Sequence, residues 1–126
     1  MQRTILLAED HEDNRMALLT VLEHDGYRTL AARNGAEAVD LAREHAPDLV
    51  VMDLAMPVMD GKEAMKVLKA DPATAGIPII VLTAMALSID GDNLRREGFD
   101  GFLAKPCMPP SLLQEVRKYI GPATGS

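Results

Sequence analysis

Short runs of apolar residues recur along the 126-residue chain, and segments with a helical hydrophobic period separate them. The runs stand at residues 4–8, 28–32, 49–52, 79–82 and 101–104. Because the runs are continuous rather than alternating, they predict strands that are buried on both faces. Such strands are typical of a parallel sheet that lies between two layers of helices.

Helical patterns fill the gaps between these runs. The first gap carries Leu18 and Leu22 at helical spacing, and the second opens with Asn34 and Glu37, a pair with the spacing of a capping box. Further helices are expected at residues 62–70, 89–97 and 111–120.

Five strands that alternate with five helices require crossover connections, which are right-handed and cover both faces of a sheet. The sequence therefore predicts an α/β fold with a doubly wound parallel sheet, and we expect the strand order 2-1-3-4-5. The length suits one domain, which we assign to residues 1–120. The small polar residues 121–126 are expected to form a flexible tail.

The charge of the chain narrows the range of partners. Nineteen acidic residues against thirteen Lys and Arg give a formal charge of -6, which argues against direct binding to nucleic acid. The longest apolar stretch is interrupted and too short to span a bilayer, and the N-terminus does not have the pattern of a signal peptide. We therefore expect a cytoplasmic protein without a membrane segment.

Polar residues follow four of the predicted strands at the point where each one ends. Glu9 and Asp10 follow the first strand, Asp53 the third, Thr83 the fourth and Lys105 the fifth. In an open parallel sheet, ligands bind outside the carboxyl ends of the strands, where the strand order reverses. Carboxylates gathered there repel one another unless a cation intervenes, and their oxygens suit Mg²⁺, with Mn²⁺ as a possible substitute.

A cation bound among carboxylates, with an ammonium group and a hydroxyl nearby, indicates phosphoryl chemistry. Lys105 and Thr83 are suited to stabilise the charge on phosphoryl oxygens during transfer. Asp53 then remains as the nucleophile.

These residues stand in motifs that resemble a known family. The motifs ED at 9–10, MDLAMPVMDG at 52–61, LTA at 82–84 and KP at 105–106 resemble a response-regulator receiver domain over residues 3–120. The resemblance implies a two-component phosphorelay protein with a CheY-like fold and a cis Lys105–Pro106 bond. It implies that Asp53 is the phosphoacceptor and that Lys105 is the cation that contacts the phosphoryl group. The implied switch residues are Thr83 and Phe102. The implied Mg²⁺ ligands are Glu9, Asp10, Asp53 and the Ala55 carbonyl.

The resemblance also implies partners. The phosphoryl donor would be a histidine kinase or a histidine phosphotransfer protein, and a downstream protein would bind the face of the fourth helix, fifth strand and fifth helix. The domain would catalyse its own phosphorylation and slow dephosphorylation, as a monomer or a phosphorylation-dependent dimer. Met1 lies close to the first strand, which favours a stand-alone receiver over one cut from a larger regulator or hybrid kinase.

Two alternatives remain open. A receiver-like adaptor would keep the fold and act without phosphorylation. A phosphohydrolase of the haloacid-dehalogenase type also uses an Asp nucleophile and Mg²⁺, but it needs a second Asp two residues later, where this chain has Ala55.

Residues around the candidate nucleophile lead to two further expectations. Ala55 and Met85 stand at positions that tune phosphate hydrolysis in the resembled family, and neither can orient water, so we expect a long-lived aspartyl phosphate. In the loop after Asp53, we expect Asp60 to cap the next helix and Gly61 to adopt a backbone conformation that other residues resist.

Overall fold

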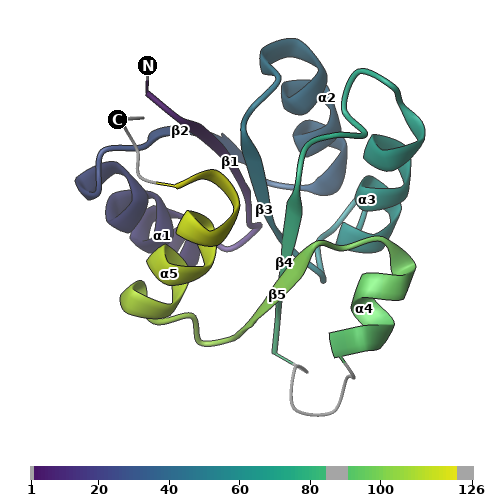
Figure 1. The fold of residues 1–126 in the computed structure, drawn as a ribbon. Helices are drawn as coiled ribbons and strands as arrows, with labels where there is room; N and C mark the ends of the chain where they lie inside the picture. Colours follow the sequence, from purple (N-terminus) through teal and green to yellow (C-terminus); the bar gives the residue numbers. More distant parts are fainter. Residues whose placement is uncertain (1, 85–90, 122–126) are drawn as a thin grey trace.

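The structure is a computed structural model that describes residues 2–84 and 91–121. In these ranges a parallel sheet of five strands has the order β2-β1-β3-β4-β5, which confirms the predicted order (Figure 1). The strands are β1 (Thr4–Ala8), β2 (Arg28–Ala32), β3 (Leu49–Asp53), β4 (Ile79–Thr83) and β5 (Gly101–Ala104).

A helix follows each strand. The helices are α1 (Glu12–His24), α2 (Gly35–His45), α3 (Gly61–Ala70), α4 (Gly91–Glu97) and α5 (Pro109–Ile120). The predicted start of the fourth helix, Ile89, lies outside the described residues. The fifth helix begins two residues earlier than predicted, because proline is tolerated in the first turn, where its missing N–H group has no helical partner.

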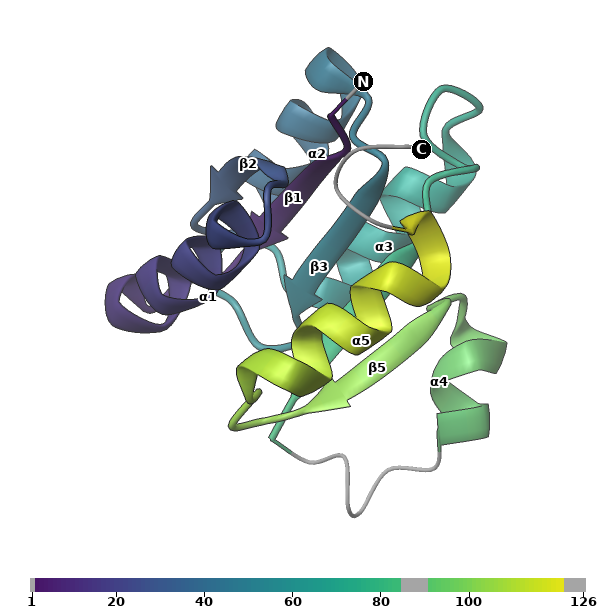
Figure 2. The same ribbon diagram turned by 60° about the vertical axis from the view of Figure 1, so that its left-hand side comes forward.

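The helices cover both faces of the sheet, as Figures 1 and 2 show together. Side chains of α2, α3 and α4 pack on one face, against strand residues such as Leu6, Val50 and Val81. Side chains of α1 and α5 pack on the other face, against residues such as Leu7 and Val51. Successive strand residues thus enter opposite core clusters, which explains the continuous apolar runs and confirms the doubly wound α/β class.

Both predicted helix caps are present. The Asn34 side chain accepts a hydrogen bond from the Glu37 N–H at 2.8 Å, and the Asp60 side chain accepts one from the Glu63 N–H at 2.9 Å. Each bond satisfies a backbone donor that has no partner within its helix. The Asp60 cap fixes the end of the loop that begins at Asp53.

The expectation for Gly61 is wrong. Its backbone is not in the left-handed region; in this loop Val58 takes that conformation, with a φ of 68°. Gly61 is needed for a different reason, since a Cβ atom on it would lie 2.5 Å from the Asp53 carbonyl oxygen. The absence of a side chain lets the start of α3 approach the end of β3.

The two described ends of the chain are both held by the turn between α1 and β2. The Gln2 side-chain amide donates to the Gly26 carbonyl at 2.8 Å, and the Tyr27 hydroxyl donates to the Gly121 carbonyl at 2.6 Å. Arg117 of α5 donates to both carboxylate oxygens of Asp25 in the same turn, at 2.8 Å each. The turn therefore ties α5 to α1 and holds Gln2 and Gly121, the two ends of the described chain, at one end of the molecule. The end of β1 that follows Gln2 and the end of α5 lie near each other in Figure 1.

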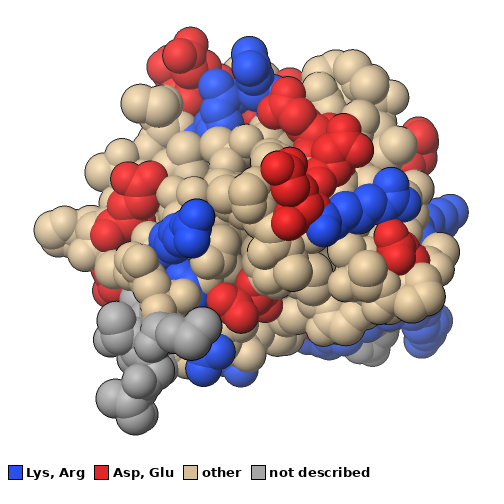
Figure 3. Space-filling view, turned by 90° about the horizontal axis from the view of Figure 1, so that it is seen from above, with Lys and Arg blue, Asp and Glu red and all other residues tan. Residues whose placement is uncertain are grey.

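The surface at that end carries charges of both signs. Seen from above, acidic and basic side chains are interspersed there (Figure 3). Such a mixture does not create the one-sign field that attracts a phosphate backbone. None of the helices in the described ranges is both long and apolar enough to cross a membrane.

Candidate functional site

The carboxyl ends of β1, β3, β4 and β5 bring the predicted site residues together, opposite the end of the sheet where Gln2 and Gly121 are held. Asp53 is the last residue of β3, and Thr83 is the last residue of β4. Parallel pairing aligns Asp53 with Leu82, and Glu9 directly follows β1, the other neighbour of β3. Glu9, Asp53 and Thr83 are buried, with 0%, 4% and 3% of their surface exposed. Polar groups buried this deeply need close partners.

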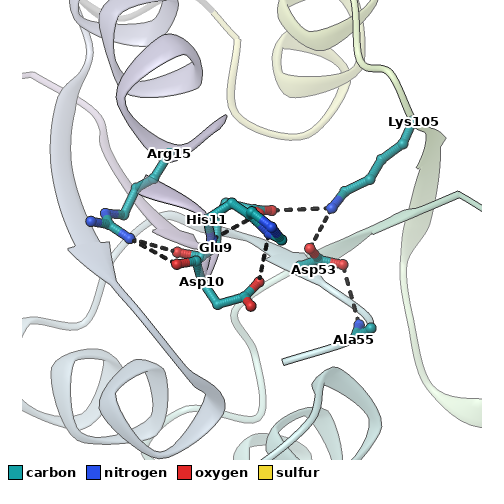
Figure 4. A network of polar contacts seen from close by, with 7 residues as sticks. All are labelled: Glu9, Asp10, His11, Arg15, Asp53, Ala55 and Lys105. Carbon is teal, nitrogen blue, oxygen red and sulfur yellow. Dashed lines mark hydrogen bonds and ion pairs between the residues drawn. The ribbon is translucent and has the colours of Figure 1, made fainter. Parts of the chain in front are cut away.

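Lys105 provides such a partner for the two buried carboxylates. Its ammonium group donates to Asp53 Oδ2 and, at 3.3 Å, to Glu9 Oε2 (Figure 4). Burial alone would lower the pKa of this ammonium, but the contacts with Asp53 and Glu9 outweigh that effect and raise the pKa. Lys105 is therefore a fixed positive charge against the candidate nucleophile. The Lys105–Pro106 peptide bond is cis, as the resemblance implied.

Glu9 is the most deeply buried of the acidic groups at the site. Burial raises the pKa of its carboxyl, and proximity to Asp53 raises it further, whereas Lys105 and the His11 backbone N–H act in the opposite direction. Both effects disfavour the charged form of this carboxyl, the second through repulsion from the neighbouring carboxylate. Added positive charge would relieve this repulsion.

Asp10 and Asp53 border a hollow of about 440 Å³ at the end of the sheet. The Ala55 N–H donates to Asp53 Oδ1 at 3.2 Å, which fixes one carboxylate oxygen while the other contacts Lys105. The hollow is lined by Asp10, His11, Asp53, Leu54, Ala55, Thr83, Ala84 and Lys105. Carboxylate and carbonyl oxygens are the donors that Mg²⁺ prefers, so this lining fits a magnesium ion.

Two residues near the acidic pair were not predicted as part of the site. The His11 ring lies beside it, with Nδ1 3.7 Å from Asp10 Oδ1 and 3.8 Å from Glu9 Oε1. Arg15 reaches back from α1 and donates to the Glu9 carbonyl at 3.0 Å and to the Asp10 carbonyl at 3.5 Å (Figure 4). Their positions were the one available signal in the sequence: His11 comes directly after the acidic pair, and Arg15 lies one turn into the helix.

Thr83 and Phe102 lie on the same side of the sheet. Phe102 pairs with Val81, two residues before Thr83, and packs against the core cluster formed with α2, α3 and α4. The Arg95 guanidinium carbon lies 5.9 Å from the centre of the Phe102 ring, so α4 contacts the candidate switch aromatic. Met85, one of the two expected tuning positions, lies outside the described residues, whereas Ala55 is exposed at the hollow.

Comparison with known proteins finds relatives that match over almost the whole chain. The polar-differentiation response regulator DivK of Brucella anthropi is 38% identical over 123 residues, which are 98% of this chain and 100% of the relative. DivK of Brucella abortus is 37% identical over the same length.

Solved structures agree with this relationship. The receiver domain of a sensor histidine kinase from Pseudomonas aeruginosa, which has a magnesium ion coordinated in its active site cleft, superposes with a TM-score of 0.87 at 34% identity. The match covers 96% of this chain and 99% of that one. The sequence profile described as "Response regulator receiver domain" matches residues 5–117. The chain therefore belongs to the response regulator receiver domain family, whose members act in two-component signalling.

Proposed function

We propose that this receiver accepts a phosphoryl group on Asp53 from a phosphohistidine of a histidine kinase or a histidine phosphotransfer protein. The observation that carries the proposal is the contact between Asp53 and Lys105 at the end of β3. One Asp53 oxygen contacts the ammonium group and the other accepts from the Ala55 N–H, so the carboxylate is held in a single orientation at the hollow. A nucleophile fixed in this way loses little freedom when it reacts.

In the transfer step, an Asp53 oxygen forms a new bond to phosphorus as the bond between phosphorus and the histidine nitrogen breaks. The nitrogen leaves with the bonding electron pair. Lys105 stabilises the charge on the transferred oxygens because its ammonium already lies against Asp53. Thr83, buried beside the hollow, is the hydroxyl that meets the phosphoryl group afterwards.

The proposed Mg²⁺ ligands are Glu9, Asp10, Asp53 and the Ala55 carbonyl. When bound, the ion supplies positive charge that offsets repulsion between the acidic groups and the incoming phosphoryl oxygens. The raised pKa of Glu9 is consistent with a site that needs such charge.

The proposed output is a change on the face formed by α4, β5 and α5, where a downstream protein would bind. Phe102 is the proposed link, because it belongs to β5 and contacts both the core and Arg95 of α4. The same proposal includes a monomer or a phosphorylation-dependent dimer, a cytoplasmic location, a receiver domain over residues 1–120 and a flexible tail at 121–126.

The phosphohydrolase alternative lacks support at the site. Ala55 lines the hollow where that chemistry needs a proton-donating carboxyl group. Because the apolar Ala55 cannot orient an attacking water at the hollow, we also propose that the aspartyl phosphate is hydrolysed slowly.

Intact-mass spectrometry after incubation with Mg²⁺ and acetyl phosphate tests the proposal. The wild type should gain one phosphoryl group, and Asp53→Asn should gain none. Asp13→Asn is the matched control, because Asp13 is an exposed residue in the first turn of α1 and should leave the adduct unchanged. A folded wild type that gains no phosphoryl group with Mg²⁺ present would overturn the proposal in favour of the adaptor.

A further inference from the structure

We propose that His11 supplies an imidazole nitrogen to the cation held by the acidic pair, and so gives this receiver affinity for late first-row transition metals. The inference deepens the proposed function, because it rests on a cation site at Glu9, Asp10 and Asp53. It concerns which ions that site accepts and how tightly.

The geometry of the site supports this role. Single donor atoms of Glu9, Asp10 and His11 all lie within 4.8 Å of one another. His11 also lines the same hollow as Asp10, Asp53 and Ala55, and its ring nitrogen Nδ1 lies 3.7 Å from the Asp10 carboxylate (Figure 4). One ion in this hollow could therefore contact oxygen donors and the imidazole together.

The His11 side chain is able to turn toward a cation without giving up a structural contact. It is 75% exposed, and although His11 precedes α1, its side chain makes no capping hydrogen bond within the described chain. The backbone beneath it is fixed, because the His11 N–H donates to Glu9 Oε1 at 3.2 Å and Arg15 holds the two preceding carbonyls. A fixed backbone with a movable ring is well suited to ligation.

The chemistry of the donors determines the expected selectivity. Magnesium prefers oxygen ligands and gains little from imidazole. Cobalt, nickel and zinc bind imidazole well, so a nitrogen donor strengthens the binding of these ions selectively. Removal of the ring should therefore weaken cobalt binding and leave magnesium binding almost unchanged.

The experiment compares wild type, His11→Ala and His24→Ala by calorimetric titration with Co²⁺ and with Mg²⁺. His24 is the matched control, because it is an exposed histidine in the last turn of α1. We expect His11→Ala to lose about tenfold or more in Co²⁺ affinity, with Mg²⁺ affinity unchanged within about twofold. His24→Ala should bind both ions as the wild type does. Proton NMR of the Co²⁺ form should show strongly shifted imidazole signals that disappear in His11→Ala.

The outcomes separate this inference from the proposed function. If wild type and His11→Ala bind Co²⁺ equally and the shifted imidazole signals persist in the variant, the role of His11 is overturned, whatever happens with magnesium. If wild type fails to bind Mg²⁺ at all, the magnesium part of the proposed function is overturned, whereas a Co²⁺ effect specific to His11 would still uphold the inference.

Discussion

At the scale of single residues, the loop after Asp53 contains two positions, Gly61 and Val58, where the residue type affects the backbone geometry. Gly61 lies so close to the backbone of Asp53, the candidate nucleophile, that a Cβ has no room there, and Val58 adopts a backbone conformation that disfavours branched side chains. Sequence patterns identified the loop but assigned the unusual conformation to the wrong residue. The close approach at Gly61 and the conformation of Val58 both result from tertiary packing, which cannot be predicted from residue type alone.

The close approach at Gly61 predicts a variant that damages the site without touching a charged group. Gly61→Ala should lower stability by about 1–3 kcal/mol and slow formation of the phosphoryl adduct, because the new Cβ would lie 2.5 Å from the Asp53 carbonyl oxygen. Urea unfolding and the time course of the mass adduct measure the two effects. Gly76→Ala is the control, since its Cβ would meet no atom within 4 Å. Equal losses in the two variants would contradict the packing argument.

The conformation of Val58 predicts a stabilising exchange. Its φ is 68° and its surface is 82% exposed, so the strain is not repaid by burial of its methyl groups. Val58→Asn should raise the free energy of unfolding by roughly 1 kcal/mol, because asparagine tolerates the left-handed region far better. Urea unfolding measures the gain. Val58→Ala, which keeps a Cβ and lacks the polar side chain, should gain less, and the reverse order would refute this explanation.

At the scale of elements, contacts between neighbouring helices and strands connect the site to the rest of the molecule. Asp71, at the end of α3, accepts from the Ala73 N–H at 3.0 Å and from Arg43 of α2 at 2.9 Å. On the other edge, Arg95 links α4 to β5 through the Phe102 ring. These two contacts predict measurable effects on acid stability and on the switch.

The Asp71 contacts predict a contribution to acid stability. The Ala73 N–H and then Arg43 lower the pKa of Asp71 below its ordinary value of 3.8. The folded state therefore gains stability from this group above that value, and loses it as the pH falls through the lowered pKa. Asp71→Asn should show a smaller loss of stability than the wild type on acidification from pH 5 to about pH 2, measured by urea unfolding. The same exchange at exposed Asp40 should leave the wild-type dependence in place.

The contact between Arg95 and Phe102 predicts an effect on the candidate switch. An exposed cation such as Arg95 over an aromatic ring contributes about 0.5–1 kcal/mol, so Arg95→Gln should let the half-buried Phe102 ring populate other positions. The chain has two phenylalanines, and ¹⁹F labelling should thus give two signals, of which buried Phe99 serves as an internal reference. We expect the Phe102 signal to shift or broaden in Arg95→Gln. Arg96→Gln is the control, and an identical change there would argue against a specific contact.

Most of the fold and much of the site could be predicted from the sequence. Strands buried on both faces leave continuous apolar runs, and the parallel order then brings Glu9, Asp53 and Lys105 to one end of the sheet. The position of the His11 ring beside the acidic pair could not be predicted, because a histidine just before a helix is ordinary in sequence. The orientation of a side chain depends on neighbours that are distant in sequence, which local patterns do not contain.

At the scale of the whole molecule, the two ends of the sheet differ in what they hold. One end gathers Asp10, Asp53 and Lys105 around the hollow. The other end holds both described chain ends on one turn, through Gly26 and Tyr27. Two core clusters, one on each face, join the ends and stabilise the strands between them.

Because Gln2 and Gly121 are hydrogen-bonded to the adjacent residues Gly26 and Tyr27, a short linker can join the two described ends of the chain. A short Gly-Ser linker between Gln2 and Gly121, with the chain reopened beside exposed Gly76, would give a circular permutant. We expect it to fold and to gain the same phosphoryl adduct, as measured by circular dichroism and intact mass. Loss of the adduct in a folded permutant would show that chain continuity between α3 and β4 matters to the chemistry. New termini beside Gly76 would then offer an attachment point for a reporter away from the turn that now holds both ends.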